Sequence, residues 1–338
     1  MKRRNTILFT CSALLVVVLF VADILIGSVA LPLGEVVGAL FGNGDEVTRN
    51  IVLNFRLPKA FTALLVGASL SAVGLQMQTL FRNPMAGPYV LGVSSGASLG
   101  VALFLLGLPL FGISANSAVS SIGVVGAAWI GSALIMSVVL AVTARIKDIM
   151  VVLILGMMFG SAATAVVEIL QYLSPEGALK SFVVWTMGSL GSVSREQLLI
   201  MAPVMILGLA LSVSLIKPLN AMLLGENYAS TMGINIRRTR LTISAITVML
   251  AGTVTAFCGP IGFIGLAVPH IARMTFREAD HRVMMPASML LGALIMLFCD
   301  VASQLPANDM TLPINTVTAL IGIPVVVVVI VRNHKSFS

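Results

Sequence analysis

Charged residues are scarce in this sequence. Only 10% of the 338 residues are Asp, Glu, Lys or Arg, whereas about one-quarter of an ordinary soluble domain is charged. Hydrophobic residues make up 58% of the chain, and the mean hydropathy is +1.06. So few charges cannot cover a water-facing surface of normal size. The composition excludes a soluble globular protein and predicts an all-α integral membrane protein in the lipid bilayer.

Motifs of metal binding and of ATP binding are also absent. The cysteines and histidines are isolated in the sequence and lack the paired spacing of a disulfide framework or a metal site; they are Cys11, Cys258, Cys299, His270, His281 and His334. The zinc-binding pattern H-E-x-x-H does not occur, and no lysine follows a glycine, which excludes a P-loop for ATP. We therefore expect no enzyme, no bound metal and no cofactor on this chain.

The net charge of +7 could suggest a nucleic-acid-binding protein. No basic run with interleaved aromatic residues occurs, and membrane proteins concentrate Lys and Arg on the cytoplasmic side, so we expect no nucleic-acid partner. The basic start and the apolar run 7–26 resemble a signal peptide that ends at Ser28-Val29-Ala30. The run is longer than the 7–15 apolar residues typical of a signal peptide, which favours a retained first helix.

Apolar runs of membrane-spanning length predict about ten transmembrane helices in a single permease domain, 1–338. Segment 262–276 is the shortest and could be a partial helix that lines a cavity. With the N-terminus and C-terminus in the cytoplasm, ten spans place three times as many Lys and Arg inside as outside, which supports both the orientation and the even number. The predicted spans are 6–29, 58–80, 92–108, 121–143, 149–172, 196–216, 241–258, 262–276, 283–303 and 313–331.

Two predicted loops stand out on opposite sides. The outer loop 30–57 contains a short amphipathic stretch, and the cytoplasmic loop 217–240 contains Gly225 and Gly233, which bracket one or two helical turns. The apolar residues 221–224 are unsuited to a solvated linker and need a protein partner or the bilayer interface.

The acidic residues of the spans test the possibility of an ion-coupled secondary transporter. Such a transporter needs ionisable groups in the middle of discontinuous helices. Asp23, Glu168 and Asp300 all lie towards the predicted outer ends of spans instead. The secondary transporter therefore remains the alternative rather than the leading interpretation.

Small residues and prolines predict where a translocation path could run. Gly92, Gly96 and Gly100 recur every fourth residue, as do Gly156 and Gly160, a spacing that allows close helix packing and would also give a smooth pore wall. Helix breaks survive at membrane depth only against protein or a watery cavity, and they occur at 83–88, 259–262 and 312–313. Structural kinks remain an alternative at each break. The candidate path residues are Asn83, Pro84, Gly92, Ser95, Gly96, Gly160, Gly262, Gly265 and Pro269.

A series of motifs resembles the permeases of binding-protein-dependent ABC importers for iron-siderophores, haem and cobalamin. The resemblance covers about residues 56–324, and the order and spacing of the motifs make it specific. The motifs are Arg56–Lys59, Gln78 with Arg82–Pro88, Leu91–Ala97, Trp185 with Gly188–Leu190, Leu224–Glu226 with Ala229 and Gly233, Gly259–Arg273, Asp280–Arg282, Asp300 and Gly322–Pro324.

The resemblance implies a homodimer in the cytoplasmic (inner) membrane with ten spans per subunit and a path along the dimer axis. Two ATPase subunits, which hold ATP and Mg, would dock on the cytoplasmic side, and an extracytoplasmic substrate-binding protein would dock outside. Arg56 and Lys59 correspond to residues that pair with the binding protein, although side chains snorkelling to the interface remain an alternative. The coupling residues would be Leu224, Gly225, Glu226, Ala229 and Gly233.

The sequence departs from the family pattern near the ninth and tenth spans. Gln304 follows the segment after Asp300 where the family often has Arg, and Thr311 and Asn315 flank the Leu-Pro pair where the family usually has Glu and Gly. These departures predict a specialised outer contact. The motifs do not distinguish an iron chelate from cobalamin or haem.

Overall fold

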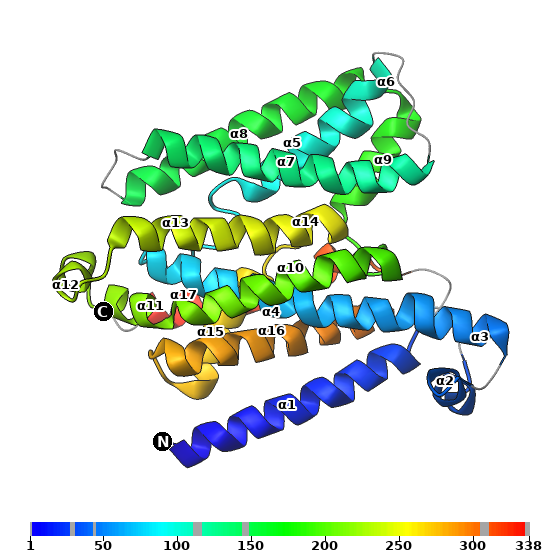
Figure 1. Cartoon of the computed structure of the whole chain (residues 1–338), viewed down its shortest axis with the longest axis horizontal. Helices are drawn as coiled ribbons and strands as arrows, with labels where there is room; N and C mark the ends of the chain where they lie inside the picture. The colour runs from blue at the N-terminus through cyan, green and yellow to red at the C-terminus, as the bar shows by residue number, and fades with distance from the viewer. Residues whose placement is uncertain are drawn as a thin grey trace.

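The structure is a computed structural model that describes residues 2–27, 31–42, 45–110, 117–143, 149–304 and 311–334. Helices account for all regular secondary structure in these ranges (Figure 1). The longer helices are α1 (Lys2–Leu25), α4 (Leu57–Leu80), α5 (Val93–Ala102), α7 (Ser117–Thr143), α8 (Ile149–Leu173), α9 (Glu176–Thr186), α10 (Arg195–Ser214), α13 (Ile236–Thr247), α15 (Ile264–Phe276), α16 (His281–Ser303) and α17 (Ile314–His334). The shorter ones are α2 (Leu33–Leu40), α3 (Glu46–Asn50), α6 (Leu108–Leu110), α11 (Ile216–Leu223), α12 (Glu226–Thr231) and α14 (Thr253–Cys258), with π-helical turns η1 (Ile51–Arg56), η2 (Leu103–Gly107) and η3 (Val248–Gly252).

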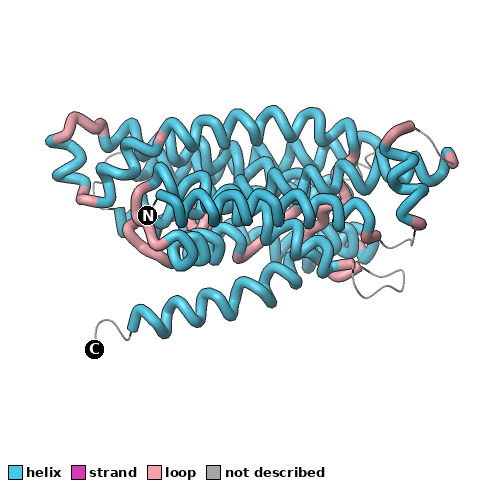
Figure 2. The backbone as a smooth tube through the Cα atoms, turned by 90° about the horizontal axis from the view of Figure 1, so that it is seen from below, coloured by secondary structure: helices cyan, strands magenta, loops and turns pink. Residues whose placement is uncertain are grey.

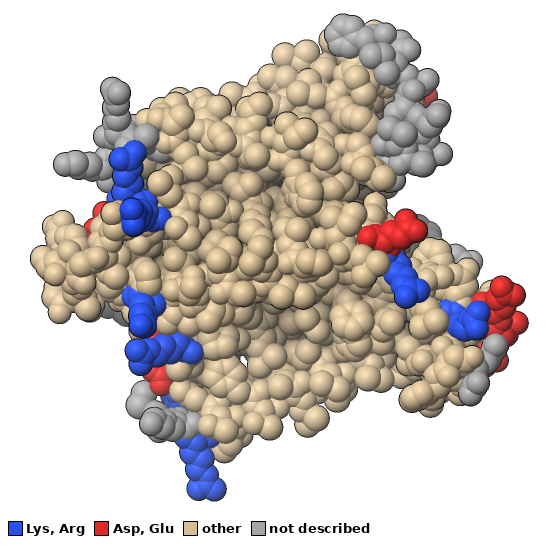
Figure 3. Space-filling model, viewed as in Figure 1, with Lys and Arg blue, Asp and Glu red and all other residues tan. Residues whose placement is uncertain are grey.

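Within the described ranges, 8 helical stretches are long and apolar enough to cross a membrane. Helix α15 and the shorter apolar stretch Ile314–Val328 of α17 bring the set to the predicted number of about ten. Both termini lie at the same end of the bundle (Figure 1), as an even number of crossings requires. Charged side chains gather at the two ends of the molecule and leave a broad uncharged band between them (Figure 3). This distribution confirms the prediction of a multi-pass membrane protein.

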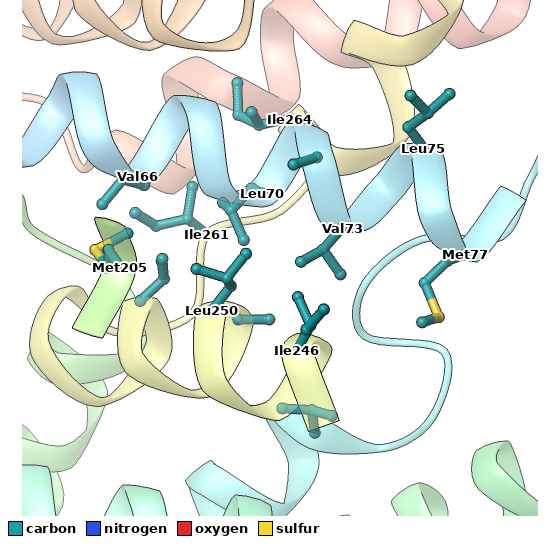
Figure 4. Close-up of a cluster of buried hydrophobic side chains, with 14 of the residues drawn as sticks. Val66, Leu70, Val73, Leu75, Met77, Met205, Ile246, Leu250, Ile261 and Ile264 are labelled. Atoms are coloured by element: carbon teal, nitrogen blue, oxygen red, sulfur yellow. The ribbon is translucent and has the colours of Figure 1, made fainter. Parts of the chain in front are cut away.

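Helix α4 forms the centre of the bundle. Every residue from Leu65 to Leu80 is buried, and α4 packs against α16, α15 and α10. Val73 and Leu70 point towards Leu250 and Ile246 of the neighbouring helix (Figure 4). The centre is therefore a packed apolar core.

Two glycines allow α4 to approach its neighbours at backbone distance. A Cβ atom at Gly74 would lie 1.6 Å from the carbonyl oxygen of Gly265 in α15, and a Cβ atom at Gly67 would lie 2.1 Å from that of Gly292 in α16. Even alanine is therefore too large at either position without a shift of the helices. Small residues have this function in membrane helix packing, where no hydrophobic force draws helices together.

The predicted boundaries were wrong at two places on one side of the molecule. The outer loop was expected to continue to residue 57, but one helical stretch runs from Glu46 to Leu80. Pro58 has no N–H group to donate to the preceding turn. The π-helical turn η1 lies just before Pro58, and through it the helix continues into α4 without a break. Residues 176–186 were expected in a loop but form α9, with Pro175 at its N-cap and Phe182 buried.

Helix α15 has 13 residues, a length of about 20 Å, which is shorter than the roughly 30 Å hydrocarbon core of a bilayer. The prediction that 262–276 is a partial helix is confirmed. Helix α17 runs along one face of the bundle (Figure 2), and Leu320, Ile323 and Val327 on it are exposed. This apolar face is suited to lipid or to a second subunit.

Candidate functional site: two cavities and a coupling segment

A cavity of about 750 Å³ lies between α5, α8, the start of α15 and the segment that precedes α5. Four of the predicted path residues line it: Gly92, Ser95, Gly160 and Gly265. They come from three separate stretches of the sequence, so the fold brings them together around one space. The walls are mainly apolar and small, as a path without tight binding requires. Their role in translocation remains a prediction.

The small residues give the cavity its shape. Gly92 has φ +76, a left-handed conformation that favours glycine. A Cβ atom at Gly156 would lie 3.0 Å from the carbonyl oxygen of Val90. Gly96, in contrast, packs against Gly131 of α7. A Cβ atom at Gly131 would lie 2.0 Å from the carbonyl oxygen of Gly96. The glycine pattern thus serves the cavity wall in one part and helix packing in another.

The remaining candidate path residues hold the backbone around the cavity. The Asn83 side chain accepts a hydrogen bond from the Met85 N–H at 2.9 Å. The Pro84 carbonyl lies 2.7 Å from Nε2 of His270 in α15. Each of these contacts fixes the break that follows α4.

The break before α15 is held in a similar way. The Gly262 N–H donates to Oδ1 of Asn315 at 3.0 Å, and Pro269 is buried inside α15. Asn315 is one of the departures from the family pattern, and here it binds a neighbouring backbone. Sequence reasoning assigned it no such partner.

A second cavity, of about 450 Å³, lies at the end of the molecule that carries α3, and Arg56, Lys59, Asp300, Gln304 and Thr311 are among its lining residues. Both predicted docking residues therefore face one space. The contact of Lys59 with the carboxylates of Asp23 and Asp300 was not predicted from the sequence, and these residues form the ion cluster described next.

The ion cluster consists of Asp23, Lys59, Asp300 and Gln304. The Lys59 ammonium lies 3.0 Å from Oδ2 of Asp300 and 3.6 Å from Oδ1 of Asp23. Gln304 donates from Nε2 to Oδ1 of Asp23 at 3.1 Å. The cluster joins α1, α4 and α16 through charges that are almost completely buried. The sequence places Asp23 and Asp300 towards the outer ends of spans and Lys59 at the start of a span, but it does not show that they contact one another.

Arg56 is also engaged inside the molecule. Its side chain is 5% exposed, and its guanidinium donates to the carbonyls of Ile24 and Leu25 at 3.0 and 2.9 Å. These carbonyls end α1, where a cation complements the helix dipole. Arg56 therefore holds the end of α1 in addition to lining the cavity, and its docking role stays a prediction.

The predicted coupling segment contains α12 and lies at the end of the bundle opposite to α3 (Figure 1). The predicted short helix between the two glycines is confirmed as α12, with Gly225 at φ +119 and Gly233 at φ +83. Ala229 is buried, whereas Leu224 is 66% exposed. One terminal guanidinium nitrogen of Arg240 donates to both carboxylate oxygens of Glu226, at 2.7 and 2.8 Å, and this ion pair ties α12 to α13.

Hydrogen bonds connect this segment to the ends of α4 and α16. Asn220 of α11 donates to Asp280 at 2.6 Å and lies 2.9 Å from Nδ1 of His281, whose Nε2 contacts Thr79 of α4. Asp280 also accepts the backbone N–H of Arg282 as the N-cap of α16. These N–H donors stabilise the carboxylate and lower the pKa of Asp280 below its ordinary value.

The fold and these sites define a polytopic membrane transport protein with a lined cavity and an exposed segment at one end. The Hemin transport system permease protein HmuU of Yersinia pestis is 34% identical, over 87% of this chain and 87% of its own. The Vitamin B12 import system permease protein BtuC of Vibrio cholerae is 34% identical, over 90% and 89%. A solved structure of a metal-chelate type ABC transporter in an inward-facing conformation is similar with a TM-score of 0.84 and 30% identity, over 97% of this chain and 99% of that one.

The model of the FecCD transport family matches residues 14–332, and the chain belongs to this family. It is a multi-pass inner-membrane permease subunit of an ABC importer. A separate ATPase subunit hydrolyses ATP in these importers, so the chain itself is no enzyme. The family does not favour the ion-coupled alternative.

Proposed function

We propose that this chain forms a homodimeric permease that imports a metal chelate, such as a ferric siderophore, haem or cobalamin, with two ATPase subunits and an extracytoplasmic binding protein. The observation that carries the proposal is the exposed apolar surface of the coupling segment, which consists of Leu223, Leu224, Tyr228 and Met232. These side chains lie at an end of the bundle where basic residues gather (Figure 3), outside the uncharged band. An apolar patch in that position suits a protein partner.

The contacts of the segment suggest how it would transmit movement. Arg82, the residue before the Asn83–Pro88 break, donates to the Met222 carbonyl at 3.4 Å. A Cβ atom at Gly225 would lie 2.9 Å from the guanidinium of Arg82. A shift of α11 and α12 by the ATPase would therefore displace the break that borders the larger cavity. Packed helices move between discrete arrangements as near-rigid bodies, which would open the path alternately to the two sides.

We further propose that Arg56 and Lys59 meet the binding protein through the smaller cavity. Both residues line that cavity at the end opposite to the coupling segment, and 15% of the Lys59 side chain is exposed. Charges at such a rim set docking register and association rate more than affinity.

The test is replacement of Leu224 by Lys in the full chain, expressed with its ATPase and binding protein. We expect loss of ATPase co-purification and of vanadate-sensitive ATP hydrolysis, because the charge enters an apolar contact. Phe41→Lys is the matched control, since Phe41 is 82% exposed near α2 at the opposite end. Normal ATPase attachment in the Leu224→Lys variant would refute the coupling role.

A further inference from the structure

The larger cavity carries a negative charge on its wall, and the family assignment does not specify this charge. Glu168 of α8 lines it, and no other charged side chain does so among the residues that the structure describes. The other polar groups on its wall are neutral, among them Ser95, Ser161 and Thr164. Each subunit therefore contributes one carboxylate and no Lys or Arg to the described part of this space.

No described cation compensates the carboxylate. The ion pairs between described residues involve Asp23, Asp300 and Glu226, and Glu168 is in none of them. The Thr164 hydroxyl, one helical turn away, donates to the Gly160 carbonyl at 3.0 Å rather than to Glu168. Glu168 itself is exposed, so its charge acts on whatever occupies the cavity.

A fixed charge in a cleft with apolar walls acts strongly on a charged ligand in that cleft, because the low-dielectric walls focus the electric field. In the homodimer proposed above, two copies of Glu168 would face the same path. A chelate with several negative charges would be repelled there, whereas a neutral chelate would not be and a cationic one would be attracted.

On the basis of the proposed function, we propose that Glu168 makes the translocation path electronegative, and that the substrate is a chelate without net negative charge. Ferric trihydroxamates and neutral corrinoids belong to this class. Oxyanions and polyanionic ferric chelates do not.

The field of Glu168 can be measured without knowledge of the substrate. Thr164→Cys places a thiol one turn from Glu168, about 5–6 Å away between Cβ atoms. Cys11→Ser removes the exposed native cysteine, and Cys258 and Cys299 are buried. The full permease with its ATPase in proteoliposomes is treated with cationic, anionic and neutral methanethiosulfonates, and their rates are compared with those for a free thiol.

We expect the ratio of cationic to anionic rates to exceed that of the free thiol by roughly five- to ten-fold, and Glu168→Gln to remove this excess. Glu176→Gln is the matched control, because Glu176 is exposed on α9 and is not among the cavity residues, so the ratio should stay unchanged. An unchanged ratio in Glu168→Gln, or a thiol that even the neutral reagent cannot reach, would overturn the proposal.

The substrate class is tested by uptake. The complete importer is given a ferric trihydroxamate and a ferric tricatecholate, which are similar in size but differ in charge. ATP-dependent uptake of the trihydroxamate, with at least ten-fold slower uptake of the tricatecholate, is the expected result. Efficient uptake of the tricatecholate or of molybdate would overturn this inference and leave the importer function intact. Absence of any ATPase partner would refute the proposed function instead, and the thiol measurement would still decide the role of Glu168.

Discussion

Replacement of Lys59 by Met should destabilise the protein by about 3 kcal/mol. The change removes the cation that lies 3.0 Å from Asp300 and 3.6 Å from Asp23, and it leaves two carboxylates facing each other with almost no access to water. Breaking a buried ion pair from one side costs about 3–5 kcal/mol. The lower end applies here because 15% of the Lys59 side chain is exposed and water screens part of the charge.

The assay is equilibrium unfolding in detergent, arranged as a double-mutant cycle. Lys59→Met and Asp300→Asn are measured alone and together, and Lys59→Arg serves as the control that keeps the cation. The double variant should be more stable than the sum of the single changes predicts by at least about 1.5 kcal/mol, because residues of one ion network do not act additively. A Lys59→Met variant within about 0.5 kcal/mol of the wild type, or a cycle without coupling, would refute the role of the cluster.

The same double variant separates folding from docking. If Lys59 also meets the binding protein, association should slow in the double variant even where stability is restored. A normal association rate would assign Lys59 to the ion cluster alone.

Two further predictions concern the core and the N-cap of α16. Gly74→Ala should cost at least about 2 kcal/mol, because its methyl group would lie 1.6 Å from the carbonyl oxygen of Gly265 and must push α15 away; thermal unfolding in detergent measures this, and a wild-type midpoint would contradict the packing described. The lowered pKa of Asp280 means that its carboxylate stabilises the fold above the unfolded pKa of about 3.9, and that this contribution disappears as the pH falls through the lower folded value. Asp280→Asn keeps an N-cap but should remove this part of the acid sensitivity, which unfolding measured between about pH 5 and pH 2 tests; an unchanged pH dependence would count against the hydrogen bonds around Asp280.

The sequence predicted the elements that depend on composition and spacing. The number of spans followed from apolar length, and the helix between Gly225 and Gly233 followed from its two flanking glycines. The helix at 46–56 was missed because sequence periodicity does not reveal a π-helical turn that passes a proline. Helix α9 was missed because a short segment after a proline is hard to distinguish from a loop.

In the candidate site, too, local patterns were predicted and contacts between distant residues were not. Gly92, Ser95 and Gly160 were predicted from local patterns, and the fold placed them around one cavity. The cluster of Asp23, Lys59 and Asp300 joins residues that are far apart in the sequence, so no local pattern could reveal it. The partner of Asn315 was hidden for the same reason.

The account depends most on the coupling segment as the place where a separate ATPase acts. A photo-cross-linking residue in place of Tyr228, which is 53% exposed on α12, tests this in the complete importer. Attachment to the ATPase subunit, with a yield that changes when ATP and vanadate are added, is the predicted result. Attachment to the binding protein, or labelling of the same position by an impermeant reagent from outside the cell, would contradict the account.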